Sequence, residues 1–139
     1  MSGYLLLRER RFEVSTAMVV LGTAAAGVEI ETHAQNIDGE WWAPGLYHQG
    51  LAVPTEERAA LTGLRFSWGH HSDADYAHPE SAFMYVFGHH DVFDAELRFG
   101  QLVDGRIAIE WDGLCDVYWD EEFMEAVPFE CRCLASIRV

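Results

Sequence analysis

The sequence predicts a mainly antiparallel β domain, a sandwich or a strongly curved sheet, with one short helix; an α+β domain is the alternative. One observation leads to this class, and a second one sets the number of domains. Apolar and polar residues alternate with a period of two along much of the chain, as in strands with one buried face. With 139 residues, half of them hydrophobic, the chain is long enough for a single domain, residues 1–139, and too short for two ordinary ones.

The N-terminal half predicts a series of strands. Residues 4–14 form a strand pair or one long strand. Residues 15–27 either continue this strand or form a short buried helix, and we favour the strand because of the valines. Residues 28–32 then alternate as an amphipathic strand, and a shorter strand is expected around residues 46–53.

Residues 54–61 predict the only helix, with Thr55 as its N-cap and its end near Gly63. Further strands are expected at residues 64–68, at 83–87 and, after an interruption of the pattern at Pro128, at 129–139. Because the helix is short and the strands are many, the predicted class is mainly β.

The strand pattern is clearest in the acidic stretch of residues 91–125. A two-residue turn at residues 104–105 would place apolar residues of one strand on the polar face of the next. We therefore predict a three-residue turn at residues 103–105 that ends on a glycine. This turn sets Phe99 opposite Ile109 on the buried face.

The same hairpin pairs Arg98 with Glu110 on its solvent face. A second turn of the same chemistry is predicted at residues 111–113, followed by a third strand. This strand should point Cys115, Val117 and Trp119 inward and Asp116 and Tyr118 outward. The first hairpin places Trp111 in a strand, whereas the second turn places it in a loop. One of the two registers is therefore off by a residue or two.

Acidic residues outnumber basic ones by 23 to 9, which gives a formal charge of -14, and all nine basic residues are arginine. Nucleic acid and anionic membranes are not expected as partners, because binding either requires a basic surface. A basic protein or a cation fits better. The charge is uneven along the chain: residues 91–125 hold eleven acidic and two basic residues, whereas Arg8, Arg10 and Arg11 lie close together near the start.

The opening residues do not have the pattern of a signal peptide, and no apolar run reaches membrane-spanning length. We therefore expect a cytoplasmic protein. The three cysteines, Cys115, Cys131 and Cys133, are an odd number without C-x-x-C spacing, which predicts buried, reduced thiols. Cys131 and Cys133 would share one face of a strand.

Two histidine-rich loops are the best candidates for a metal site. Residues 69–80 read G-H-H-S-D-A-D-Y-A-H-P-E, and residues 88–91 read G-H-H-D. The side chains suited to a divalent transition metal are His70, His71, Asp73, His78, His89 and His90. Their spacing matches no zinc or calcium motif. A metal-binding domain or metal-dependent enzyme is thus the alternative function, and the leading one involves no cofactor.

Motifs for catalysis are absent from the sequence. It contains no G-x-S-x-G, no phosphate-binding glycine loop and no dinucleotide-binding fingerprint. Carboxylate pairs such as Glu110 and Asp112 could act as acid and base, but a chain with 23 acidic residues always offers such a pair. We favour a non-enzymatic protein and leave open an active site assembled from residues that no motif reveals.

The acidic stretch combines carboxylates with exposed aromatic side chains, a mixture that attracts a basic protein and then holds it by packing. Adjacent side chains of a strand point to opposite faces, so at least one of Trp41 and Trp42 is expected to be exposed. It either covers the end of the sheet beside Pro44, which we favour, or acts as a further anchor. The candidate partner-binding residues are Asp112, Asp116, Tyr118, Asp120, Glu121, Glu122, Trp41 and Trp42.

In its overall character, a small, lysine-free domain with an acidic, aromatic face and no catalytic motif, the chain resembles the immunity proteins that neutralise bacterial polymorphic or contact-delivered toxins. The resemblance implies that the partner is a toxin and that the chain blocks a basic active site or substrate groove. It assigns no individual residue. Our leading hypothesis is therefore an acidic protein-binding domain of the immunity type.

Overall fold

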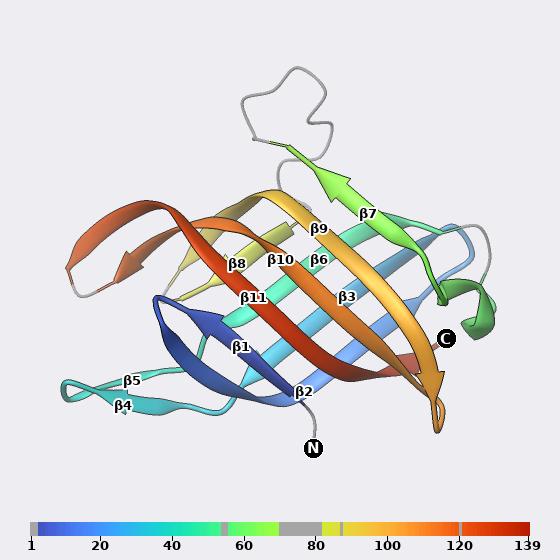
Figure 1. Cartoon of the computed structure of the whole chain (residues 1–139), viewed down its shortest axis with the longest axis horizontal. Coiled ribbons are helices and arrows are strands. Elements are labelled where there is room, and N and C mark those ends of the chain that lie inside the picture. The colour runs from blue at the N-terminus through green and yellow to red at the C-terminus, as the bar shows by residue number, and fades with distance from the viewer. Residues whose placement is uncertain (1–2, 54–55, 70–81, 87, 120) are drawn as a thin grey trace.

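In the computed structural model, residues 3–53, 56–69, 82–86, 88–119 and 121–139 are described, and most of them lie in β-strands (Figure 1). The strands are β1 (Gly3–Leu7), β2 (Arg10–Leu21), β3 (Ala25–Thr32), β4 (Gln35–Ile37), β5 (Glu40–Trp42), β6 (Gly45–Ala52), β7 (Arg65–Trp68), β8 (Ala82–Tyr85), β9 (His89–Val103), β10 (Arg106–Trp119) and β11 (Glu122–Arg138). The predicted class, mainly antiparallel β, is confirmed.

Hydrogen bonds between strands close the large sheet on itself. Its strands follow the order β10-β11-β1-β2-β3-β6-β8-β9-β7, and β9 pairs in addition with β10. The pairing of β11 with β1 ends where Cys133 lies opposite Gly3, the first residue of β1. Beyond it, residues 136–138 of β11 pair directly with residues 18–20 of β2 in a parallel arrangement. β4 and β5 form a separate hairpin. The large sheet therefore encloses its inner face and turns its other face outward.

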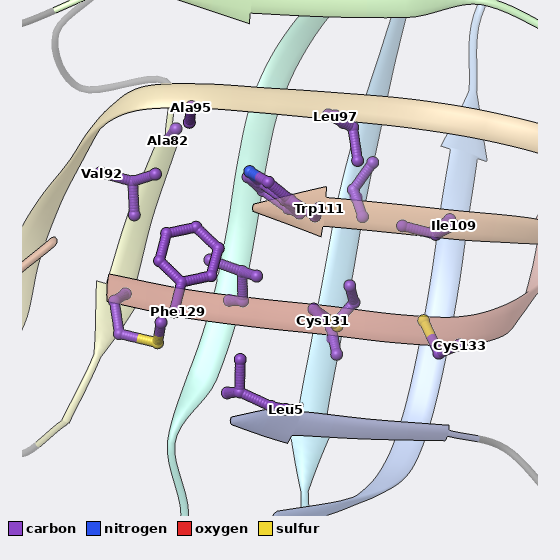
Figure 2. Close-up of a cluster of buried hydrophobic side chains, with 14 of the residues drawn as sticks. Leu5, Ala82, Val92, Ala95, Leu97, Ile109, Trp111, Phe129, Cys131 and Cys133 are labelled. Atoms are coloured by element: carbon purple, nitrogen blue, oxygen red, sulfur yellow. The ribbon is translucent and has the colours of Figure 1, made fainter. Parts of the chain in front are cut away.

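The inner face holds the hydrophobic core. Side chains from β1, β9, β10 and β11 gather in one cluster, with Trp111 fully buried among them (Figure 2). Each buried side chain of this size contributes about 1.5–3 kcal/mol to folding. The alternation in the sequence is thus explained by one face of each strand being removed from water.

The three cysteines are buried and reduced, as predicted, and Cys131 and Cys133 share the inner face of β11. Burial, and secondarily the charge of Asp116, raises the pKa of Cys115 to about 12. A hydrogen bond with Cys133, together with burial, raises the pKa of Cys131 well above its usual value. Both thiols therefore stay protonated and unreactive at neutral pH.

The helix predicted at residues 54–61 is reduced to a single 3-10 turn, η1 (Arg58–Leu61), without a side-chain N-cap. Thr55, the predicted cap, lies outside the described residues. Only Leu61 of the turn is buried, so the segment has no apolar face that would support a longer helix. Just beyond it, the N–H of Gly63 donates to the carbonyl of Phe99, which returns the chain to the sheet.

The predicted three-residue turn between β9 and β10 is wrong. The turn has two residues, Asp104 and Gly105, both with positive φ, and Val103 pairs with Arg106. The predicted neighbours further along, such as Phe99 with Ile109 and Arg98 with Glu110, are nevertheless correct. They are preserved because a bulge in β9 adds one residue between the turn and Phe99.

The second predicted turn, at residues 111–113, does not occur, because β10 continues to Trp119. Gly113 instead permits a close approach between strands: a Cβ atom at this position would lie 2.6 Å from the Cβ of Ala95 in β9. The predicted facing of the later residues is confirmed, with Cys115, Val117 and Trp119 buried and Tyr118 exposed.

Pro128 does not interrupt the strand pattern, and β11 begins at Glu122, seven residues before the predicted start. Pro128 lies opposite Leu114 of β10. On the other edge of β11, pairing with β1 starts only at Phe129. Because the proline lies beyond the end of β1, it has no partner strand on that edge, where a missing N–H is tolerated.

Candidate protein-binding surface

Three hairpin ends meet at one end of the molecule, on the left of Figure 1: the β1–β2 turn, the β4–β5 hairpin and the β10–β11 hairpin. They are held together by aromatic contacts. The ring of Trp42 in β5 stacks on Trp119 in β10, with centroids 4.0 Å apart and planes 10° from parallel. Phe12 of β2 packs edge-on against the same indole at 6.2 Å. This end therefore brings together most of the residues predicted to bind a partner.

Exposed aromatic side chains concentrate here. Trp41 is 64% exposed, whereas Trp42 is 3% exposed, as expected for neighbours on opposite faces of a strand. Tyr118 and Phe123 lie opposite each other on β10 and β11 and are 49% and 55% exposed. Large exposed aromatic pairs are typical of the centres of protein interfaces.

Trp41 and the Tyr118–Phe123 pair do not belong to one surface. Trp42 and Trp119 face each other between β5 and β10, so Trp41 lies on the face of β5 that is turned away from β10. Tyr118 lies between the inward residues Val117 and Trp119, so it points to the outer face of β10, away from β5. The Tyr118–Phe123 pair is thus the anchor for the face predicted from the acidic stretch.

The predicted acidic residues surround this pair. Glu121 and Glu122, at the tip of the β10–β11 hairpin, are exposed, and so is Glu125 in β11, which sequence reasoning did not single out. Asp116 has a structural task as well, because its Oδ1 accepts a hydrogen bond from the N–H of Ala126 at 3.0 Å and stabilises a bulge there. Asp120 lies outside the described residues.

Asp112 is placed differently from the other predicted acids. Its carboxylate accepts hydrogen bonds from Arg98 Nη2 at 2.9 Å and Arg132 Nη1 at 2.8 Å. Arg98 also binds Glu110 at 3.1 Å, the pair expected from the sequence, and it contacts Glu96. This group of charges links the outer faces of β9, β10 and β11. The charge of Asp112 is therefore largely neutralised within the chain.

The acid dependence of stability should report on this carboxylate. Burial alone would raise the pKa of Asp112, but the hydrogen bonds from Arg132 and Arg98 outweigh it and hold the pKa below its ordinary value. A lowered folded-state pKa means stability that is present above the unfolded-state pKa and is lost as the pH falls through the folded-state value. Asp112→Asn should cost about 1 kcal/mol at neutral pH, since the site is partly exposed.

The measurement is urea unfolding at two pH values, one neutral and one below the pKa of the Asp112 carboxyl group in the folded protein. The difference between the wild type and Asp112→Asn should vanish in acid. Asp104→Asn is the matched control, because Asp104 is exposed in a turn that also accepts asparagine, and it should change stability little. An equal loss in both variants at neutral pH would contradict the role given to the two arginines.

A shallow groove of about 450 Å³ lies on the outer face beside Asp112. Its apolar lining includes Leu6 of β1 and Pro128 of β11, together with the backbone at Gly113. Its acidic lining consists of Glu9, Asp112 and Glu130. The hydroxyl of Tyr4 donates a hydrogen bond to Glu130 at 2.7 Å, which fixes that carboxylate at the edge of β1. Asp112 and Glu130 already lie beside Arg132, so Glu9 is the acid of the groove that forms no ion pair with a described residue. The groove therefore suits an apolar side chain with a positive charge on the side of Glu9.

The predicted metal ligands give no described site. His70, His71, Asp73 and His78 lie outside the described residues, and only the backbone of His89 is described. The Nε2 of His90 lies 3.4 Å from the carbonyl oxygen of Val86. Within the described ranges, no group of three or more histidine, cysteine or acidic residues is arranged to hold a metal ion. The metal hypothesis remains a prediction.

Comparison with known proteins adds no functional assignment: no protein-family model, no curated protein and no solved structure matches this chain. None of the helical structure in the described residues is long and apolar enough to cross a membrane. What can be stated is the class of the fold, a closed and mainly antiparallel sheet with an acidic outer face at the β10–β11 hairpin.

Proposed function

We propose that this chain is a non-enzymatic binding protein for a basic protein, and that it acts as an immunity protein that covers the active or substrate site of a toxin. The observation that carries the proposal is the exposed Tyr118–Phe123 pair beside Glu121, Glu122 and Glu125. Neighbouring exposed aromatic side chains are uncommon on a protein surface that has no binding partner. Their surroundings select a positively charged partner.

The face is continuous from the hairpin tip to the groove. The outward pairs Tyr118 with Phe123, Leu114 with Pro128 and Asp112 with Glu130 follow one another along β10 and β11. At about 3.4 Å per residue, the stretch from Tyr118 to Asp112 covers roughly 20 Å, which suits the width of a standard protein interface. A partner could bury aromatic contacts at the tip and place an apolar side chain in the groove.

The net charge of -14 should act before contact. Carboxylates at the tip would attract the partner over distances of about a Debye length and so raise the association rate. The aromatic pair would then slow dissociation, because it removes apolar surface from water. Fast association and slow dissociation suit a protein that must bind its target before the target acts.

The test is binding to a basic toxin domain, with the product of a neighbouring gene as the first candidate. Replacing Glu121 and Glu122 by lysine should slow association by about tenfold or more at low salt and weaken its salt dependence. Tyr118→Ala combined with Phe123→Ala should mainly raise the dissociation rate. Surface plasmon resonance at several salt concentrations separates the two effects.

The matched control replaces Glu29 and Glu56 by lysine, which makes the same change in net charge at exposed positions away from the β10–β11 hairpin. This variant should bind almost as the wild type does. If both double variants slow association equally, the charge acts through the whole molecule and the proposed face is wrong. If the wild type binds no basic protein and protects no toxin-producing cell, the proposed function is wrong.

A further inference from the structure

A second concave site lies between the same three hairpins. This pocket, of about 370 Å³, is lined by Arg8, Glu9, Arg10, Ile37, Asp38 and Trp119. Its residues come from the β1–β2 turn, the β4–β5 hairpin and the end of β10. Trp119 and Tyr118 point to opposite faces of β10, so the pocket and the aromatic pair of the proposed interface face different ways.

The guanidinium group of Arg8 is fixed by stacking. Its central carbon lies 5.0 Å from the ring centroid of Trp119. Trp42 occupies one face of that indole at 4.0 Å, so Arg8 must cover the other face. Stacking in this way engages the flat face of the guanidinium, so an acceptor must approach along its edge, in the plane of its N–H groups.

These N–H groups have few acceptors within the protein. Nη1 of Arg8 is enclosed and has no hydrogen-bond partner, and among the described residues neither Arg8 nor Arg10 forms an ion pair. Arg11, Arg98 and Arg132 pair with carboxylates, whereas the other described arginines, like Arg8 and Arg10, form no ion pair with a described residue. Arg8 differs from the others because one of its nitrogens is buried without an acceptor at the wall of a pocket, which favours an anion bound there.

The turn that carries Arg8 supports the same conclusion. Arg8 and Glu9 have φ values of 51° and 64°, so both residues of the turn are in the left-handed region without a glycine. The turn at Asp38 and Gly39 and the turn at Asp104 and Gly105 use the favourable residue types for this geometry. An arginine held in a disfavoured conformation at the wall of a pocket is typical of a functional position.

We propose that this pocket binds a small carboxylate that also carries a positive charge, as in a free α-amino acid. The planar edge of Arg8 matches the two oxygens of a carboxylate. Glu9 and Asp38 balance the two arginines, so the lining has no net charge and an acidic chain would repel a polyanion. The same two acids can receive the positive group of the ligand. The pocket shares Glu9 with the groove on the outer face, but Arg8, Arg10 and Asp38 do not line that groove.

The probes are L-alanine, propionate, which lacks only the ammonium group, and inorganic phosphate, each added at constant ionic strength. Binding is followed by the indole N–H signals in ¹H–¹⁵N spectra. In the wild type, L-alanine should cause a saturable shift of the Trp119 signal with a dissociation constant on the order of 1 mM, propionate should bind more weakly, and phosphate weakest.

Arg8→Asn is the informative variant, because asparagine tolerates the left-handed turn and should leave the fold intact. Its dissociation constant for L-alanine should rise by about tenfold or more. Arg106→Asn, which removes an exposed arginine directly after the other two-residue turn, at Asp104 and Gly105, is the control and should bind as the wild type does. Thermal unfolding of both variants confirms that they are folded.

Three results would overturn the proposal: no saturable shift with L-alanine in the wild type, an unchanged affinity in folded Arg8→Asn, or tighter binding of phosphate than of L-alanine. None of these bears on whether the β10–β11 face binds a protein. Conversely, a loss of toxin binding in the Glu121 and Glu122 variant leaves the pocket unaffected, because neither residue lines it.

Discussion

Trp119→Ala should lower the free energy of unfolding by about 3–5 kcal/mol, the largest loss expected for any substitution at the hairpin end. The indole is 5% exposed and packs on Trp42, on Phe12 and under Arg8. Its removal leaves a cavity between hairpins that few other contacts join. Beyond the loss of global stability, the β4–β5 hairpin should detach from β10. Urea unfolding and amide exchange at residues 35–42 measure the two effects.

Tyr118→Ala is the control for this substitution, since it removes an adjacent aromatic side chain that is half exposed. It should cost less than about 1 kcal/mol and leave amide exchange in the β4–β5 hairpin unchanged. If Trp119→Ala loses stability but the hairpin amides remain as protected as in the wild type, then the Trp42–Trp119 stack does not hold the hairpin in place.

Gly113→Ala should be the second most damaging change, with a loss of about 2–3 kcal/mol. The added Cβ would lie 2.6 Å from the Cβ and 3.0 Å from the Cα of Ala95, and 3.1 Å from Cε2 of Phe129. Backbone atoms of β9 cannot move aside without disturbing the ladder that they form with β10. The midpoint of urea unfolding, compared with that of the wild type, measures the loss.

Two further variants separate this clash from a general effect of alanine. Gly50→Ala places its Cβ in open space, so its stability should lie within about 0.5 kcal/mol of the wild type. Ala95→Gly in the Gly113→Ala background removes the shortest contact and should recover part of the loss. A Gly113→Ala protein as stable as the wild type would mean that β9 and β10 can separate at this point at little cost.

Alternation was sufficient to predict which side chains of β10 are buried, because a strand with one wet face must repeat every two residues. Cys115, Val117 and Trp119 were placed correctly for this reason. The predicted turn before β10 was wrong because it requires an unbroken ladder, whereas β9 contains bulges. One of them contains Asp94, a non-glycine residue with a φ of 44°, so its sequence gives no warning.

Parts of the candidate surface were accessible to the same reasoning. Exposure of Tyr118 and of one tryptophan of the Trp41–Trp42 pair follows from strand parity alone. The neutralisation of Asp112 by Arg132 could not be foreseen, because the two residues become neighbours only when β10 and β11 pair. The pocket at Arg8 was missed for a similar reason, although the arginines near the start of an otherwise acidic chain were a usable signal.

The closed sheet also constrains when the protein can fold during its synthesis. β11 is made after the other ten described strands, yet it pairs with β10 on one edge and with β1 and β2 on the other. Until residues 122–138 leave the ribosome, β1 and β10 present unpaired edges that invite contact with other nascent chains. Contacts this distant in sequence form slowly. Chaperones that shield exposed edges should therefore increase the yield of this protein more than agents that stabilise its finished form.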